Sequence, residues 1–390
     1  MVMKANIPMR YLLAIPALCA VLLASGCVSM RPSQAKQWFR GNTHAHTIRS
    51  DGDSAPEVVA KWYHDHNYNF LVITDHNKFV DPREIKLPDE KRDDFLLIPG
   101  EEITGSKAIH TTAMNITNVA SWKFDHTERS EIIQYHVDQA MAAGGQAVLN
   151  HPNFKYAASA EDILPVRHLS MFELFNGHPS VHNHGDSKHP STEAMWDHLL
   201  TEGMKIFAVS SDDTHHLKTI AANKANPGRG WVMVHAASLD PDAITRAMLQ
   251  GDFYASNGVF LKTCERGPRT YLIEVDAQKT RGELTSLPAL RGKPVENGSE
   301  GFRIEFIGPA GKVLDTIKGE EGRFQIDGSI PYVRAKATFT RAHPDTGTLE
   351  EYYAWGQPVF TDASVATKAL PGNSDRSGPL AGRSVSLLSH

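Results

Sequence analysis

The chain has 390 residues, with 40 basic and 45 acidic side chains that leave a formal net charge of −5. This mild acidic balance, with no long basic stripe, disfavours nucleic acid as an obligatory partner. Since a domain usually holds roughly 100–200 residues, the length indicates two domains. Of the 3 cysteines, only Cys264 lies beyond the N-terminal segment, which excludes a disulfide framework.

The N-terminal segment has the pattern of an export signal. A basic start with Lys4 and Arg10 precedes an apolar run over residues 11–24, shorter than the about 20 residues that a membrane-spanning helix needs. Small residues then lead into Cys27. This arrangement resembles a bacterial lipobox, although Leu23 stands one place earlier than in the commonest pattern.

The lipobox resemblance implies that residues 1–27 are a lipoprotein signal peptide and that Cys27 becomes the lipidated first residue of the mature chain. Val28, in place of an aspartate after the cysteine, favours the outer membrane in that resemblance. We therefore expect a protein of the bacterial cell envelope that is lipid-anchored, faces the periplasm and does not cross the membrane. Residues 28–38 would be a linker.

The following segment, residues 39–258, alternates short apolar strands with amphipathic helices. This alternation predicts an α/β domain with a mainly parallel sheet, either open or closed into a barrel. The predicted strands are residues 70–74, 95–98, 146–150, 171–175 and 206–211. The predicted helices are residues 56–66, 130–143 and 192–202.

After residue 258 the pattern changes to strands separated by Gly, Pro, Asp and Asn turns, which predicts a small antiparallel β-sandwich over residues 259–361. The predicted strands there are residues 270–275, 302–307, 324–326, 332–340 and 352–358. No catalytic constellation occurs in this second domain. Residues 362–390 are rich in Ser, Gly, Ala and Pro, and we expect a disordered tail.

Histidines, 20 in all, gather with acidic residues at the ends of the predicted strands of the first domain. The first strand ends in His44-Ala45-His46, where strand alternation points both imidazoles to one face. The other candidate ligands that follow strands are Asp51, His76, Glu102, His110, His151, Asp212, Asp213 and His215. Because the C-terminal strand ends of an α/β barrel meet at one mouth, we expect these side chains to converge. Mixed imidazoles and carboxylates suit zinc, manganese or iron.

The candidate ligands fall into ordered motifs. In chain order these are H-x-H at His44, S-D-G at Asp51, T-D-H at His76, P-G-x-E at Glu102, H-P at His151 and S-D-D-T-H ending at His215. The ordered set resembles the polymerase and histidinol phosphatase (PHP) superfamily of metal-dependent phosphoesterases. The resemblance implies a distorted (β/α)7 TIM-like barrel that holds two or three divalent metal ions.

Carried over motif by motif, the resemblance implies three groups of ligands. They are His44, His46, Glu102 and a late aspartate; Glu102, His110 and His151; and Asp51, His76 and His215. The family's S-D-x-H is one residue longer here, so strand alignment favours Asp212 and spacing to the histidine favours Asp213. The P-G-x-E pattern selects Glu102 over Glu101, which we expect to be solvated.

The mechanism that follows is metal-assisted hydrolysis by a water that bridges two metals. Catalytic candidates besides Asp213 are Arg49, inside a metal motif, and His178, which follows a strand and would act as a general acid, contact substrate or be a polar loop residue. For a phosphate ester, fixed cations would hold the non-bridging oxygens, and Arg49, Lys155 and Arg229 are candidates. A solvated surface position is the alternative for each cation.

The leading hypothesis is a phosphoesterase that acts on small phosphate mono- or diesters, nucleotides included. The alternative is carboxyl-ester, carbamate or amide hydrolysis at the same site, because phosphate-clamping cations are scarce. A third hypothesis is a non-catalytic metal-binding surface lipoprotein. We expect the histidine-rich residues 178–189 to form a flexible lid or rim, and His136 to face solvent on its helix.

Overall fold

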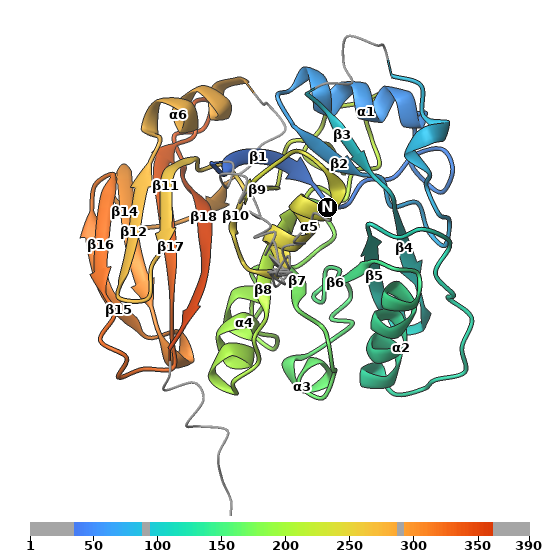
Figure 1. Ribbon diagram of the computed structural model, residues 1–390. Coiled ribbons are helices and arrows are strands. Elements are labelled where there is room, and N and C mark those ends of the chain that lie inside the picture. Colours follow the sequence, from blue (N-terminus) through green and yellow to red (C-terminus); the bar gives the residue numbers. More distant parts are fainter. Residues whose placement is uncertain (1–34, 88–93, 287–291, 362–390) are drawn as a thin grey trace, which may run out of the picture. The chain divides into compact units, whose positions relative to one another are not determined.

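The computed structural model describes residues 35–87, 94–286 and 292–361 (Figure 1). The predicted signal peptide with Cys27 and the predicted tail therefore lie outside the described residues. The helices are α1 (Pro56–Asp65), α2 (Arg129–Ala142), α3 (Ala160–Ile163), α4 (Thr192–Thr201), α5 (Pro241–Leu249) and α6 (Ala277–Ser286). Among the described residues, no helix is both long and apolar enough to cross a membrane.

The strands fall before and after the predicted boundary at residue 258. Those before it are β1 (Gln37–Asn42), β2 (Phe70–Val72), β3 (Leu96–Ile98), β4 (Gly100–Thr104), β5 (His110–Met114), β6 (Gln146–Leu149), β7 (Met171–Asn176), β8 (Phe207–Ser211), β9 (Trp231–Ala236) and β10 (Phe253–Ser256). Those after it are β11 (Leu261–Arg266), β12 (Thr270–Val275), β13 (Lys293–Pro294), β14 (Gly301–Ile307), β15 (Val313–Lys318), β16 (Glu321–Gln325), β17 (Tyr332–Ala342) and β18 (Leu349–Phe360).

The first part of the chain is mixed α/β, as the alternation of strands and helices predicts. Parallel pairs join β1 to β2, β2 to β3, β6 to β7 and β7 to β8. The prediction of a mainly parallel sheet is wrong, because β1–β9, β9–β10, β4–β5 and β5–β6 pair antiparallel. Strands β4 and β5 form an antiparallel hairpin that the sequence pattern missed. Gly100 begins this hairpin, where a Cβ would lie 2.3 Å from Val72 Cγ1, so only glycine allows the close approach of β4 to β2.

Two isolated bridges draw the strand ends of separate sheets together. Ala45, just after β1, pairs in parallel with Thr214, just after β8. His76, after β2, pairs in parallel with Glu102 in β4. The candidate ligands therefore meet at one place, although a closed seven-stranded barrel stays a prediction.

Helix α1 shows how local sequence positions the site. Pro56 at the first helical position presets the backbone angle, and Glu57 in the first turn complements the helix dipole. The buried face carries Val59, Ala60 and Tyr63, at a helical spacing. Tyr63 thereby reaches Asp212 after β8, with its Oη donating to Oδ2 at 2.8 Å.

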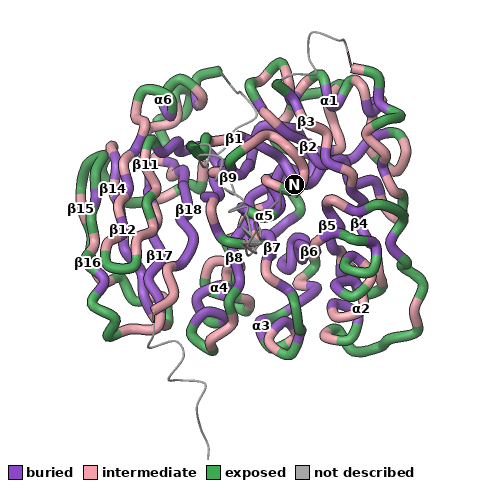
Figure 2. The backbone as a smooth tube through the Cα atoms, in the orientation of Figure 1, coloured by how far each residue is buried: buried purple, intermediate pink, exposed green. Residues whose placement is uncertain are grey.

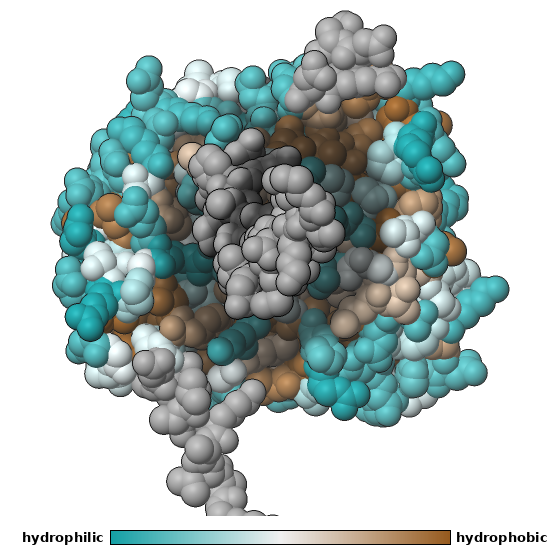
Figure 3. Space-filling model, in the orientation of Figure 1, coloured by the Kyte–Doolittle hydropathy of each residue, from teal (hydrophilic) through white to brown (hydrophobic). Residues whose placement is uncertain are grey.

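The strands after residue 258 are antiparallel, as predicted. One large sheet has the order β15-β14-β17-β18-β10-β9-β1-β2-β3, and a smaller one the order β11-β12-β16. Because β10 pairs with both β9 and β18, the large sheet runs through the predicted domain boundary. Buried residues concentrate in β9, β10, β17 and β18, whereas β15 and β16 are mostly exposed (Figure 2). Hydrophilic residues predominate around the rim of the face shown in Figure 3.

A buried ion-pair network fastens β17 to α4. Arg334 of β17 donates from Nε and Nη2 to the two carboxylate oxygens of Asp197, each at 2.7 Å. Glu193 lies 3.1 Å from Arg334 Nη2 and 2.7 Å from Lys336 Nζ. Both acidic residues belong to α4, so the C-terminal sheet is tied to the helix that follows β7.

Candidate metal centre

The His44-Ala45-His46 segment runs beyond the end of β1 in an extended conformation. His46 N donates to Thr214 O at 2.8 Å, and Asp213 N donates to His44 O at 3.1 Å. This pairing leaves both imidazoles on one side, as predicted, with His44 Nε2 and His46 Nε2 only 3.1 Å apart. The two ring nitrogens can share one cation in this arrangement.

Glu102 of β4 lies at the centre of the cluster and is fully buried. Its Oε1 lies 3.2 Å from His44 Nε2, 3.3 Å from His110 Nδ1 and 3.4 Å from His151 Nε2. Its Oε2 lies 2.7 Å from His76 Nδ1 and 3.6 Å from His46 Nε2. Burial works to raise the pKa of Glu102, but the imidazoles, His44 first, hold it well below its usual value.

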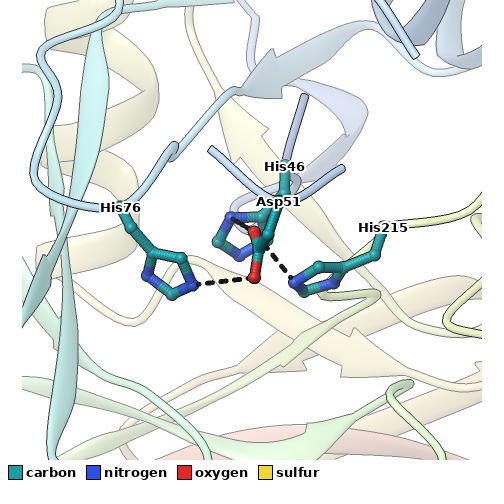
Figure 4. A group of neighbouring side chains, drawn as sticks. All are labelled: His46, Asp51, His76 and His215. Atoms are coloured by element: carbon teal, nitrogen blue, oxygen red, sulfur yellow. Dashed lines mark ion pairs between the residues drawn. The ribbon is translucent and has the colours of Figure 1, made fainter. Parts of the chain in front are cut away.

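Asp51 gathers a second set of imidazoles, as Figure 4 shows. Its carboxylate oxygens lie 3.5 Å from His46 Nδ1, 3.4 Å from His76 Nε2 and 3.3 Å from His215 Nε2. Burial lowers the pKa of His76, but the carboxylates of Asp51 and Glu102 raise it to about 10 on balance. The negative charges of Asp51 and Glu102 therefore favour positive charge at this place, which bound cations would supply.

Asp213, and not its neighbour, faces the cluster. Asp213 Oδ1 lies 3.1 Å from His46 Nε2 and 3.4 Å from His44 Nε2. Asp212 instead accepts hydrogen bonds from Tyr63 Oη and from the backbone N–H groups of residues 228–230, at 2.6–2.9 Å. The prediction that Asp212 is a metal ligand does not fit this geometry, because both of its oxygens are already occupied on the far side.

The described residues contain four groups whose ligand atoms lie within 4.8 Å of one another. They are His46, Asp51, His76 and His215; His44, His46 and Glu102; His44, His151 and Asp213; and His76, Glu102 and His110. Glu102 Oε2 makes no hydrogen bond of ordinary geometry among these residues, although it lies 2.7 Å from His76 Nδ1 as an ion pair. A buried cluster of imidazoles and carboxylates with an incompletely satisfied carboxylate oxygen fits divalent cations.

Glu173 of β7 is a site residue that the sequence reasoning missed. Its Oε1 accepts from His44 Nδ1 at 2.8 Å, and its Oε2 accepts from the backbone N of His151 and from Asn176 Nδ2, both at 2.8 Å. The first contact leaves Nε2 of His44 to face the cluster. Glu173 sits mid-strand, so the only signal available was an acidic residue within an otherwise apolar run.

Two more polar residues hold the ligands in place. Asn150 Nδ2 donates to Glu102 Oε1 at 2.7 Å. Asp75 accepts from the backbone N and the hydroxyl of Thr47 at 2.8 and 2.7 Å, and from Ser50 Oγ at 2.6 Å. Both neighbour a candidate ligand in sequence, which is the signal that was available for finding them.

A cavity of about 240 Å³ opens over the cluster. It is lined by Asp51, His76, Glu102, His110, His151, Phe154, His178, Asp213 and His215. His178 Nδ1 accepts from the backbone N–H of Ser180 at 3.1 Å, which assigns the ring proton to Nε2. Burial lowers the pKa of His178 to about 4, so this imidazole is neutral near pH 7.

The predicted phosphate-binding cations do not line this cavity. Arg229 is buried and donates to the carbonyl oxygens of Gly177 and Ala221, at 3.1 and 2.8 Å. Arg49 pairs with Glu84 at 3.0 Å. Lys155 is exposed, with Nζ 5.0 Å from the centre of the Phe154 ring. Their predicted roles in catalysis and substrate binding are not supported by a direct contact with the cavity.

The histidine-rich residues 178–189 supply no member of the four ligand groups among the described residues. His178 lines the cavity and His189 stacks on Tyr156 with ring centres 3.6 Å apart, while a flexible lid or rim stays a prediction. Two expectations for other residues are wrong. Glu101 and His136 are both fully buried rather than solvated, because the hairpin and α2 turn these side chains into the core.

No protein-family model and no curated protein matches the sequence. Among solved structures, a two-domain protein from Bacteroides vulgatus ATCC 8482, described as containing a predicted PHP-like metal-dependent phosphoesterase, is 15% identical, with a TM-score of 0.41. That match covers 82% of this chain and 95% of the other.

A second solved structure, from Bifidobacterium adolescentis ATCC 15703, is described as a candidate metal-dependent phosphoesterase. It is 14% identical, with a TM-score of 0.35, and the match covers 48% of this chain and 89% of the other. Both descriptions name the class that the ordered motifs resemble. At such identities and TM-scores, neither likeness assigns a residue role or a substrate to this chain.

Proposed function

We propose that this protein is a metal-dependent hydrolase that cleaves small phosphate mono- or diesters, nucleotides included. The observation that carries the proposal is the buried carboxylate of Glu102, which lies within 3.6 Å of five imidazoles. Burying this many titratable groups is costly unless charge is compensated, and divalent zinc, manganese or iron ions suit the mixture of ligands.

The contacts of each residue indicate its role in the reaction. Bound cations would lower the pKa of a water molecule and neutralise charge on the ester oxygens. Glu102, Asp51 and Asp213, with the surrounding imidazoles, would hold two or three of these cations. Glu173 fixes the ring of His44, so that its Nε2 lone pair is directed at the cluster.

His178 would contact the substrate from the cavity wall. In hydrolysis, water adds its hydroxyl to phosphorus, the bond from phosphorus to the leaving oxygen breaks, and the leaving oxygen takes up a proton. The neutral ring of His178 carries its proton on Nε2 and offers a hydrogen bond to a substrate oxygen. We assign it this orienting role because little imidazolium exists near pH 7 at a pKa of about 4.

One observation favours a second candidate, the hydrolysis of carboxyl esters, carbamates or amides by the same centre. Among the described residues that line the cavity, there is no lysine or arginine. A dianionic phosphate would therefore depend on the metal ions for charge compensation, whereas a carboxyl ester needs less of it.

We also propose that the chain is anchored through a lipid on Cys27, at the periplasmic face of the bacterial outer membrane. The support is the N-terminal sequence pattern, which lies outside the described residues. The partners would then be a small ester substrate and a membrane surface, without an obligatory nucleic acid.

The test is an activity panel on the full-length protein, purified in mild detergent and saturated with each metal in turn. We expect release of phosphate from mono- or diesters, with Glu102→Gln losing at least about 10²-fold in kcat. Glu161→Gln is the matched control, because that side chain is 75% exposed. Turnover of carboxyl esters alone would establish the second candidate, and a metal-loaded protein inert on both classes would establish a non-catalytic metal-binding lipoprotein.

A further inference from the structure

Phe154 is the one apolar side chain among the described residues that line the cavity over the metal cluster. The other lining side chains are histidines, aspartates and a glutamate, all suited to cations or polar groups. The cavity, at about 240 Å³, is smaller than the roughly 300–1,000 Å³ of common ligand pockets, so a bound ester must touch most of its wall. The apolar Phe154 ring therefore helps to determine which group, besides the phosphate, a bound ester can have.

The backbone that carries Phe154 is held in place by its neighbours. Phe154 N donates to His151 O at 2.8 Å, and Phe154 pairs with Val181 in an isolated antiparallel bridge. Asn153 Nδ2 donates to the carbonyl oxygens of His182 and Pro190, at 3.0 and 2.9 Å. The loop that carries Phe154 is thus fastened to the histidine-rich residues 178–189, which holds in place the backbone that presents the ring to the cavity.

The ring meets two imidazoles by its edges rather than by flat stacking. Its centre lies 5.3 Å from that of His151 at an angle of 73°, and 6.4 Å from that of His178 at 72°. One neighbour belongs to a metal ligand group and the other carries the Nε2 proton donor. An ester bound between His151 and His178 would therefore also contact the Phe154 ring.

A second apolar feature lies on the loops around the cluster. Ile48 is 60% exposed on the segment between His46 and Asp51, and Ile220 is 50% exposed on the segment after His215. Asp53 joins these segments, since its N donates to His215 O at 2.8 Å and its Oδ1 accepts from Leu217 N at 3.0 Å. Both exposed isoleucines therefore stand on loops that supply candidate metal ligands.

From this arrangement we infer that the natural substrate has an apolar leaving group, which packs against Phe154 and extends toward the isoleucines. The inference rests on the proposed function and adds the substrate class to it. The phosphate end would face the cluster, where the titratable side chains are, and the apolar end would avoid them. Burial of apolar area against the Phe154 ring would contribute binding free energy. Ion pairs with lysine or arginine contribute none, because neither residue type occurs among the described residues that line the cavity.

The experiment measures binding separately from turnover, with methyl-, butyl- and hexylphosphonate as probes. Their Kd values are measured by calorimetry on the metal-loaded full-length protein, since phosphonates resist hydrolysis. Each fully buried methylene is expected to tighten binding by up to about fourfold, so butylphosphonate should bind at least about tenfold more tightly than methylphosphonate. Rates for methyl, butyl and hexyl phosphate, whose leaving groups differ little in acidity, are measured in parallel.

Phe154→Ala should remove most of this dependence on chain length, weaken methylphosphonate far less than the longer probes and leave the metal content unchanged. Phe154→Leu is the matched control, because it keeps an apolar wall and should keep most of the dependence. The double variant Ile48→Ser with Ile220→Ser should weaken hexylphosphonate alone, while Val313→Ser, also at an exposed apolar residue, should change nothing.

Equal Kd values for the three phosphonates in the unaltered protein, or an unchanged series in Phe154→Ala, would overturn the inference while phosphate-ester hydrolysis still supports the function. Failure to bind any phosphonate together with failure to cleave any phosphate ester would overturn the proposed function itself.

Discussion

At the scale of single residues, the choice between Asp212 and Asp213 shows what the sequence leaves open. Two adjacent carboxylates follow β8, and a one-residue shift along an extended chain turns a side chain to the opposite face. The motif alone favoured neither residue. The left-handed backbone at Asp213, with φ of 52°, brings its carboxylate to the cluster, and sequence patterns do not reveal such a local turn.

We predict opposite effects for substitutions of the two aspartates. Asp213→Asn should reduce bound metal and activity, because it removes a negative oxygen 3.1 Å from His46 Nε2. Asp212→Asn should keep the metal and instead lower the free energy of unfolding by about 1–3 kcal/mol, since an amide replaces an acceptor of four hydrogen bonds. Metal analysis and chemical denaturation of both variants check this, and metal loss in Asp212→Asn alone would contradict it.

Glu173 gives a second prediction at this scale. Glu173→Gln keeps the size of the side chain but removes the charge that accepts from His44 Nδ1. We expect metal affinity to fall by about 10–100-fold, as for other partners of metal-binding histidines. Competition with a chromophoric chelator measures the affinity. Glu161→Gln serves as the exposed control, and equal affinity in both variants would show that Glu173 does not orient the ligand.

At the scale of elements, periodicity identified those that later pack against one another. The predicted helices at residues 56–66, 130–143 and 192–202 correspond to α1, α2 and α4 within one residue at each end. The hairpin β4–β5 was missed because Glu101 and Glu102 are charged residues in a strand, and propensity does not favour them there. Tertiary contacts with β6 and the imidazoles override that local preference.

The junction of α4 with β17 yields a prediction about acid stability. Burial alone would raise the pKa of Glu193, but Lys336 and Arg334 lower it from 4.5 to about 2. Because the folded value is depressed, this carboxylate stabilises the fold above pH 4.5, and the contribution is lost as the pH falls from 4.5 toward 2. We expect the loss to be on the order of 2 kcal/mol.

Glu193→Gln should therefore reduce stability at pH 7 and make it less sensitive to pH over that acidic interval. Urea denaturation of both proteins between pH 7 and pH 3 measures the difference. If the two unfolding free energies differ by the same amount at every pH, the ion pairs with Arg334 and Lys336 do not act through the ionised carboxylate.

At the scale of the whole molecule, the sequence predicted two features with different success. It predicted the convergence of the candidate ligands better than it predicted the connections between the sheets. Glu102, the H-x-H pair, Asp51, His76, His110, His151 and His215 all reach one cluster, because Glu102 lies within β4 and each of the others follows or begins a strand. The pairing of β10 with both β9 and β18 joins the two predicted domains in one sheet. Such long-range pairing depends on contacts between segments far apart in the chain, which local patterns do not encode.

The proposed function requires that this cluster binds two or three divalent metal ions. The most direct measurement is elemental mass spectrometry of the full-length protein, as purified and after metal removal and resupply, with Glu102→Gln beside it. We predict two or three zinc, manganese or iron ions per chain in the unaltered protein and fewer in the variant. Less than one ion per chain, unchanged by resupply, would contradict the assignment of the cluster as a metal centre.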